Sequence, residues 1–158
     1  MKIVLDSNIF VSSFYWAGNP RKVFDRVTNG LDELYITDEI LDEIISVMSN
    51  KKFDTSIDEI KEYTKIIESY SITLPSKDIP EKISRDEDDN KILQCGFDGD
   101  VDFIITGDND LLVLKEYVKI KIVKPKEYLD KNILKSDLKM INGRGVNNDF
   151  KNKKRLYK

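Results

Sequence analysis

The sequence predicts an α/β protein with three layers, α/β/α, in which helices cover both faces of a central, mostly parallel sheet. Two observations support this fold class. Short runs rich in Val and Ile alternate along the chain with segments whose apolar residues recur at helical spacing. Such alternation is typical of parallel strands joined by right-handed helical crossovers. The chain has 158 residues, which suits a single domain with a sizeable core.

Five strands are expected, because Val, Ile and aromatic residues favour a pleated, half-buried surface. They are KIVL (2–5), ELYI (33–36), ITL (72–74), DFIIT (102–106) and KIKIV (119–123). We find no internal repeat. The strands are separated by helical segments, so most of them should run in the same direction.

Six helices are expected between these strands, at about residues 8–14, 20–30, 37–49, 56–70, 88–97 and 109–116. Pro20 suits the first turn of the second helix, and Gly30 suits its end. Thr37 can cap the third helix. Ser56 and Glu59 form a capping box for the fourth.

The composition indicates a soluble globular protein, with 40% hydrophobic and 35% charged residues. No run approaches the roughly 18 apolar residues of a membrane span. The start of the chain lacks the apolar core of a signal peptide. Cys95 is the single cysteine and cannot form an internal disulfide. We expect a cytoplasmic protein without a membrane partner.

The sequence contains no histidine, which excludes Ser-His-Asp and Cys-His mechanisms. Carboxylates are abundant, and clustered carboxylates are hard oxygen ligands for Mg²⁺ or Mn²⁺. Function should therefore be sought among the acids.

Acidic residues follow two of the predicted strands. Asp6 comes directly after KIVL, and Asp108 comes shortly after DFIIT, with Asp110 two residues later. Ligands of open α/β sheets bind beyond the carboxyl ends of the strands. These acids are therefore expected near a site.

Helical geometry indicates two further acids. At about 100° per residue, Glu43 lies on the flank of the apolar face of its helix, whereas Asp42 lies nearly opposite and should meet water. Asp89 lies in line with Ile92 and Leu93, near the start of its helix. A carboxylate on a buried stripe needs an explanation, and a site beside the strand ends would supply one.

Each of these acids also has an ordinary structural explanation. Asp6 and Asp89 could cap helices, Glu43 could be a solvated helix residue, and Asp108 could be a turn residue. Their combination is more informative, because all four are expected at the same end of one sheet. Two carboxylates about 4 Å apart repel by roughly 4 kcal/mol at an effective dielectric of 20, so converging acids need a cation or protons.

Four segments resemble motifs of the PIN-domain nucleases, in the same order and at similar spacing over about residues 1–130. They are LDSNIFVSSF, ITDEILDEI, SRDEDDNKIL and ITGDNDLL. The closest similarity is to the VapC-like toxins of toxin–antitoxin systems. The predicted domains are therefore a PIN-like nuclease domain at 1–130 and a basic C-terminal extension at 131–158.

The resemblance implies a catalytic and metal-binding site formed by Asp6, Glu43, Asp89 and Asp108. Asp89 is chosen from a run of four acids that starts at Asp86. The resemblance also matches Asp110 to an additional metal-binding acid. It matches Asn8 and Thr106 to polar residues that support the site.

The implied function is a metal-dependent endoribonuclease that uses one or two Mg²⁺ or Mn²⁺ ions. It would hydrolyse RNA phosphodiester bonds and leave a 5′-phosphate and a 3′-hydroxyl. The expected partners are RNA, a small antitoxin protein and a second copy of the chain. The alternatives are an aspartate-nucleophile phosphatase, a receiver-type Mg²⁺-binding phosphoacceptor module, and a PIN fold that acts mainly by protein binding.

Charge is distributed unevenly around a net value of −3. Residues 1–130 carry 17 basic and 27 acidic residues, whereas residues 131–158 carry 9 and 2. Nucleic-acid binding needs positive groups, and the tail KNKKRLYK (151–158) supplies some. The tail could contact RNA, cover the acidic body of this or a neighbouring subunit, or be a solvated end.

Overall fold

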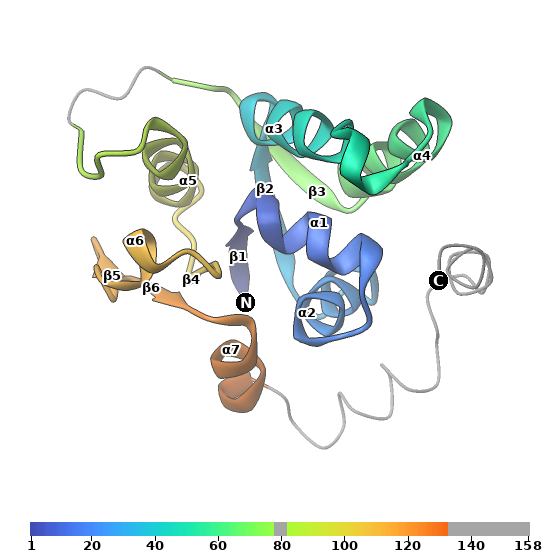
Figure 1. Cartoon of the computed structure of the whole chain (residues 1–158). Coiled ribbons are helices and arrows are strands. Elements are labelled where there is room, and N and C mark those ends of the chain that lie inside the picture. The colour runs from blue at the N-terminus through green and yellow to red at the C-terminus, as the bar shows by residue number, and fades with distance from the viewer. Residues whose placement is uncertain (78–81, 133–158) are drawn as a thin grey trace.

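The computed structural model describes residues 1–77 and 82–132 (Figure 1). The predicted extension at 131–158 lies outside the described residues, except for the last two residues of a helix. The elements in chain order are β1 (Lys2–Leu5), α1 (Ser7–Tyr15), α2 (Asn19–Thr28), β2 (Glu33–Thr37), α3 (Asp38–Met48), the 3₁₀ helix η1 (Lys51–Phe53), α4 (Ile57–Ser69), β3 (Ser71–Leu74), α5 (Glu87–Asp98), β4 (Phe103–Ile105), α6 (Asn109–Leu112), β5 (Glu116–Tyr117), β6 (Ile120–Val123) and α7 (Pro125–Asn132). Within the described ranges, no helix has the length and apolar character needed to span a membrane.

The fold is an α/β sheet of six strands in the order β3-β2-β1-β4-β6-β5, which confirms the predicted fold class. All neighbouring strands are parallel except β5, which runs antiparallel to β6. The chain moves outward from β1 through β2 to β3 and then crosses back to β4. The order of strands thus reverses between β1 and β4, and ligands of such sheets bind at this point.

The register of β1 and β4 places their following residues side by side. Leu5 pairs with Ile105 at the last position of both strands. The backbone amide of Asp6 then donates to the carbonyl of Ile105, at 3.0 Å. Asp6 and Thr106 therefore leave the sheet together at its carboxyl edge.

Helices cover both faces of the sheet. Figure 1 shows α5 on one side of β1, with α1, α2 and α7 on the other. α5 packs across β1, β2 and β4. It approaches closely at Gly96, where a Cβ atom would lie 3.0 Å from Cδ1 of Ile104. This close packing holds α5 against β4, and Asp89 lies about two turns earlier on the same helix.

The helix α3 lies at that same edge, where it contacts both α1 and α5. It begins as predicted, because the Thr37 hydroxyl accepts a hydrogen bond from the Ile40 backbone amide at 3.4 Å. The predicted capping box of α4 is also present, with reciprocal bonds between Ser56 and Glu59. These two caps determine the residues at which α3 and α4 begin.

The region after β4 differs from the prediction in two respects, of which the first concerns α6 and β5. The helix predicted over 109–116 ends at Leu112, and Glu116 instead begins β5, a short strand that forms a hairpin with β6. The two residues of the hairpin turn, Val118 and Lys119, have positive φ angles of 45° and 70°. Asn and Gly usually mark such turns, so a Val-Lys pair gave no indication of one.

The helix α7 was not predicted. It begins at Pro125 and carries ion pairs one turn apart, Lys126 with Asp130 and Glu127 with Lys131. Its buried residue Tyr128 packs against Phe103 of β4, with ring centroids 5.1 Å apart. The packed body of the protein therefore extends to the end of α7.

Candidate active site

Asp6 stands at the end of β1 and is nearly buried, with 7% of its surface exposed. It occupies the N-cap position of α1, yet its side chain makes no capping hydrogen bond within the described chain. Its two carboxylate oxygens instead accept from the Ser7 hydroxyl, at 3.3 Å, and from the Thr106 hydroxyl, at 2.6 Å. The hydroxyls of Ser7 and Thr106 therefore hold the Asp6 carboxylate.

Thr106 connects the two acids that follow β1 and β4. The residue is fully buried. While it donates to Asp6, its hydroxyl accepts from the backbone amide of Asp108 at 2.9 Å. Asp108 is half-buried and in turn accepts from the backbone amide of Asp110 at 2.9 Å. Thr106 thus joins the Asp6 carboxylate to the backbone of Asp108, whereas Asp110 itself is exposed.

Glu43 on α3 lies in the same region as Asp6. The side chain is half-buried, whereas the neighbouring Asp42 is exposed, as the helical arithmetic predicted. Burial raises the pKa of Glu43, the Ser7 hydroxyl lowers it, and the charges of Asp88 and Asp6 raise it further. Ser7 therefore lies between the carboxylates of Asp6 and Glu43.

Asp89 in the first turn of α5 is the most buried acid of its run, at 5% exposed. Its carboxylate accepts from the Ser84 hydroxyl at 2.9 Å. Asp86 caps the helix through the backbone amide of Asp88, and Asp88 is exposed and pairs with Lys91 at 3.1 Å. Burial favours the choice of Asp89 within this run, because a capping bond alone does not distinguish Asp86 from Asp108, which caps α6 in the same way.

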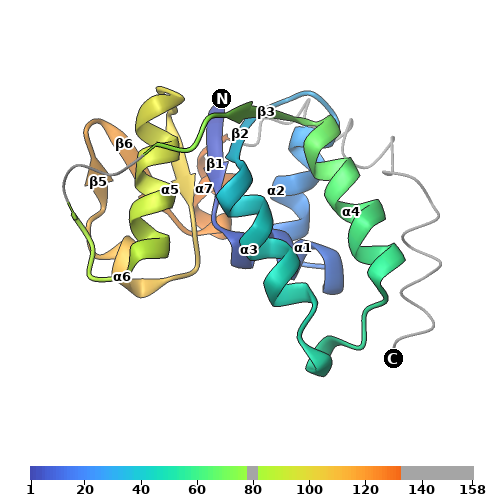
Figure 2. The ribbon, with the colours of Figure 1, turned by 90° about the horizontal axis from the view of Figure 1, so that it is seen from above.

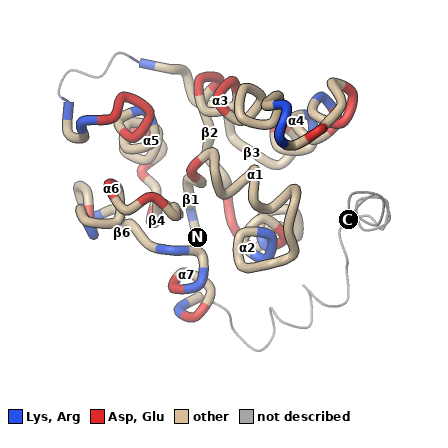
Figure 3. The backbone as a smooth tube through the Cα atoms, viewed as in Figure 1, with Lys and Arg blue, Asp and Glu red and all other residues tan. Residues whose placement is uncertain are grey.

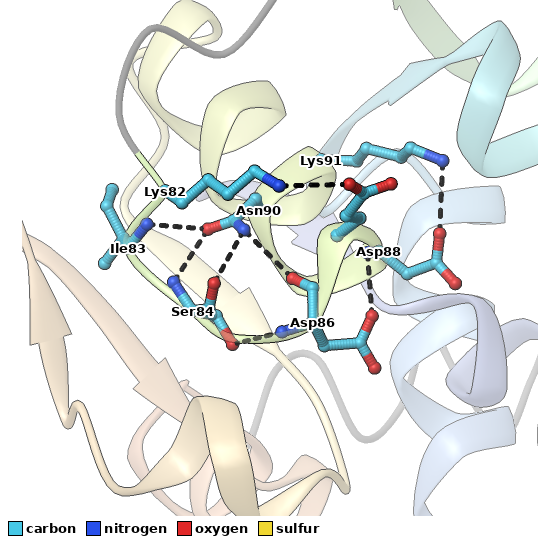
Figure 4. A network of polar contacts seen from close by, with 8 residues as sticks. Lys82, Ile83, Ser84, Asp86, Asp88, Asn90 and Lys91 are labelled. Atoms are coloured by element: carbon cyan, nitrogen blue, oxygen red, sulfur yellow. Dashed lines mark hydrogen bonds and ion pairs between the residues drawn. The ribbon is translucent and has the colours of Figure 1, made fainter.

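The buried side chain of Asn90 holds the loop that carries Ser84 (Figure 4). Its amide oxygen accepts from the backbone amides of Ile83 and Ser84, at 3.0 and 2.8 Å. Its amide nitrogen donates to the carbonyls of Ser84 and Asp86, at 2.9 and 3.0 Å. Because every hydrogen-bonding position of the amide is used, the loop is fixed over the start of α5.

The four predicted acids are coupled electrostatically, and Asp6 is their common neighbour. Burial raises the pKa of Asp6, with the bonds from Thr106 and Ser7 opposing and the charge of Asp108 adding to the rise. Burial likewise raises the pKa of Asp89 to about 6, and the charges of Asp108 and Asp6 contribute. Asp6 also acts on Glu43. Figure 3 shows the acidic segments on α3, α5 and α6 that surround this edge.

The acids are close enough to repel one another, but they are not gathered into a tight set of ligands. Among residues 1–77 and 82–132, no three His, Cys, Asp or Glu side chains lie close enough together to hold a metal ion. The chemistry of the donors nevertheless fits a hard divalent cation, because all are carboxylate oxygens and three have raised pKa values.

Three features of the site differ from the expectation or were not foreseen. Asn8 was expected to support the site; its side chain is exposed on the first turn of α1, and its backbone amide lowers the pKa of Asp6. Ser84 and Asn90 were not predicted. The motif SRDEDDN contains both residues, but only the folded loop shows that Ser84 binds Asp89 and that Asn90 holds the loop.

The fold and this cluster define an α/β protein with a carboxylate-based candidate active site at its topological switch point. Comparison with known families gives a match to the PIN domain over residues 2–110, which includes Asp6, Glu43, Asp89, Asp108 and Asp110. The chain belongs to the PIN-domain family, whose fold is generally that of a nuclease. No curated protein matches the sequence significantly.

Proposed function

We propose that this protein is a divalent-metal-dependent endoribonuclease that hydrolyses RNA phosphodiester bonds. One observation carries the proposal. The buried Asp6 at the switch point of the sheet is coupled to Glu43, Asp89 and Asp108, which come from three other elements. Membership of the PIN-domain family supports a nuclease.

In this proposal Asp6, Glu43, Asp89 and Asp108 hold Mg²⁺ or Mn²⁺, with Asp110 at the open side. When bound, such a cation offsets the negative charge of the carboxylates, polarises a phosphodiester and makes a water molecule a better nucleophile. The protein's own groups prepare the site. Thr106 and Ser7 orient the Asp6 carboxylate, and Ser84 orients that of Asp89.

Burial of these acids also serves the proposed chemistry. Charges interact more strongly in a region from which water is excluded. Fixed donors such as the Thr106 hydroxyl keep the carboxylates in place, so little reorganisation is needed during the reaction. We expect cleavage to leave a 5′-phosphate and a 3′-hydroxyl.

We further propose that the protein is the toxin of a toxin–antitoxin pair, acting in the cytoplasm. This part rests on the similarity of its motifs to VapC-like toxins. The partner would be a small antitoxin that places a basic side chain among these acids, and the toxin would form a homodimer. Co-expression with the product of the neighbouring open reading frame tests this, because an antitoxin should co-purify and inhibit cleavage.

The receiver-type alternative is disfavoured by the order of strands. Receiver-like sheets have the order 2-1-3-4-5, in which the third strand lies beside the first. Here β3 lies outside β2, and β4 is the neighbour of β1. The chain therefore crosses past β1 only after a third strand has been added outside β2, which is not the receiver order.

The activity can be tested directly with three substrates. Purified protein with millimolar Mn²⁺ should cleave a labelled RNA, should leave a phosphomonoester intact, and should not become phosphorylated by acetyl phosphate. Asp6→Asn should abolish the RNA cleavage while circular dichroism remains unchanged. Hydrolysis of the phosphomonoester or phosphorylation at Asp6 would overturn the proposal, as would intact RNA after prolonged incubation.

A further inference from the structure

A group of three aromatic rings, of which Trp16 is exposed, lies at the far end of α1 from Asp6. Tyr15 stacks on Phe53 of η1, with centroids 4.6 Å apart and ring planes at 9°. Trp16 lies against both rings, at 5.6 Å from Tyr15 and 6.5 Å from Phe53. Trp16 is 57% exposed, which is unusual for a large aromatic side chain. We call Tyr15, Trp16 and Phe53 the aromatic platform.

The aromatic platform rests on the protein core. The Tyr15 hydroxyl is hydrogen-bonded to the Thr55 hydroxyl. Tyr15 also meets Phe14 edge-on at 4.9 Å, and Phe14 packs on the buried Tyr63 at 4.8 Å. The exposed ring of Trp16 is thus backed by fixed aromatic neighbours, so it can receive a planar partner with little loss of conformational entropy.

Two lysines border the aromatic platform on η1, while the acidic Glu59 of α4 acts on Tyr15. Lys52 places its ammonium 4.9 Å from the centre of the Phe53 ring, and Lys51 beside it is also exposed. Aromatic rings next to exposed cations are the combination that single-stranded nucleic acids require, because bases stack on the rings while phosphates meet the charges. A purely apolar partner would gain nothing from the two lysines.

The position of the aromatic platform also suits a strand that passes through the acidic site. α1 begins directly after Asp6 and has nine residues, which corresponds to a length of about 14 Å. Figure 2 shows η1 at the same edge of the molecule as α6 and the start of α5. A few nucleotides of single strand can span this distance.

We propose that the aromatic platform binds unpaired bases of single-stranded RNA, with Trp16 as the stacking surface and Lys51 and Lys52 beside the phosphates. This inference deepens the proposed function and rests on it, because it assigns a single-stranded segment as the substrate. The platform holds the strand at a distance from the acids and thereby positions the phosphodiester.

Trp16 is the only tryptophan in the sequence, so its fluorescence reports on this one position. The titrant is a short single-stranded oligoribonucleotide, added in the presence of a chelator so that no cleavage occurs. Stacking of a base on the indole should quench the fluorescence in a saturable manner. The same RNA annealed to its complement should quench far less, because its bases are already stacked and paired.

Variants then test whether the contact contributes to affinity, measured by the anisotropy of a fluorescein-labelled RNA. Trp16→Ala should weaken binding by about 5- to 150-fold, the range for loss of one stacked base. Trp16→Phe should recover most of the affinity. The matched control is Phe97→Ala. Phe97 is another exposed aromatic residue, with 51% of its surface exposed, near the C-terminal end of α5, and its removal should leave the RNA affinity unchanged.

Asp6→Asn separates this inference from the proposed function. That variant should lose cleavage but keep the fluorescence quench, and quenching without cleavage by the wild type would refute only the nuclease. Equal quenching by the duplex, or equal RNA affinity of Trp16→Ala and wild type, overturns the inference. A Trp16→Ala variant with unchanged RNA affinity but an altered oligomeric state would assign the aromatic platform to a protein contact instead.

Discussion

Thr106 donates a hydrogen bond of 2.6 Å to the Asp6 carboxylate, across the ends of two adjacent strands. The two residues are 100 positions apart in the sequence. Both residues are buried, and the hydroxyl also accepts from the backbone of Asp108. One side chain thus fixes the orientation of the first acid and the start of the loop that carries the second. Supporting partners of this kind commonly determine how well a metal ligand performs.

Thr106→Val keeps the shape of the side chain and removes both hydrogen bonds. The fold should persist, because Val suits a buried strand end, but the Asp6 carboxylate loses its strongest donor. We expect Mn²⁺ affinity, measured by calorimetric titration, to fall by about 10- to 100-fold. Thr106→Ser retains the hydroxyl and should stay close to wild type. Equal affinity of the Val and wild-type proteins would show that the bond does not orient Asp6.

Divalent metal should raise the thermal stability of the protein, because it relieves repulsion among acids that are further apart in the unfolded chain. At a concentration 100 times the dissociation constant, the gain is about 2.7 kcal/mol. Melting temperatures are compared with EDTA and with millimolar Mn²⁺ or Mg²⁺, and Mn²⁺ should bind at least as well. Asp6→Asn should lose the increase. Identical melting of the wild type in EDTA and Mn²⁺ would contradict a metal site.

The pH dependence of stability should carry the signature of Asp89. Its pKa is raised from 3.8 to about 6 by burial first and by acidic neighbours second. Between these values the folded state binds more protons than the unfolded state, so this contribution to stability is present below about pH 4 and is lost as the pH rises through 6. Asp6 and Glu43 have pKa values shifted in the same direction.

Asp89→Asn removes that titration. In metal-free buffer, the free energy of unfolding of Asp89→Asn relative to that of the wild type should increase between pH 4 and pH 7. The increase should reach up to about 3 kcal/mol for a pKa shift of this size. Urea unfolding at several pH values measures the difference. A difference that stays constant over this pH range would show that Asp89 has an ordinary pKa in the folded protein.

Asn90→Ala should loosen the loop that carries Ser84. The substitution removes four hydrogen bonds from a buried position and leaves backbone groups without partners, so we expect a loss of about 2–3 kcal/mol in urea unfolding. Gln94→Ala on the same helix is the control and should change stability by less than about 0.5 kcal/mol. Equal effects of the two substitutions would refute the special role of Asn90.

The strands and the first helices could be predicted because local patterns determine them. β1 has the predicted bounds, and the caps at Thr37 and Ser56 use side chains next to the helix they begin. The burial of Asp89 and the exposure of Asp42 also followed from helical periodicity alone. In each case the information lies within a few residues of the feature.

The remaining features depend on contacts that no local pattern contains. The bond from Thr106 to Asp6 spans most of the chain, and the Asn90 network exists only once the loop has folded over α5. The hairpin of β5 and β6 turns at Val118 and Lys119, residues that normally avoid positive φ. Tertiary packing overrides local preference there, so the sequence indicated a longer helix.

The central claim is that acids from four elements form one metal-dependent nuclease site, and two adjacent residues of α3 test it most directly. Glu43 is half-buried and coupled to Asp6, whereas Asp42 is exposed. The measurement is the rate of Mn²⁺-dependent cleavage of a labelled RNA by Glu43→Gln and by Asp42→Asn, with circular dichroism to confirm folding. Removal of a residue that only supports a metal ligand typically lowers activity by about 10- to 100-fold. We predict a larger loss of cleavage rate for Glu43→Gln, while Asp42→Asn cleaves like wild type. Equal rates for the two folded variants would contradict the account.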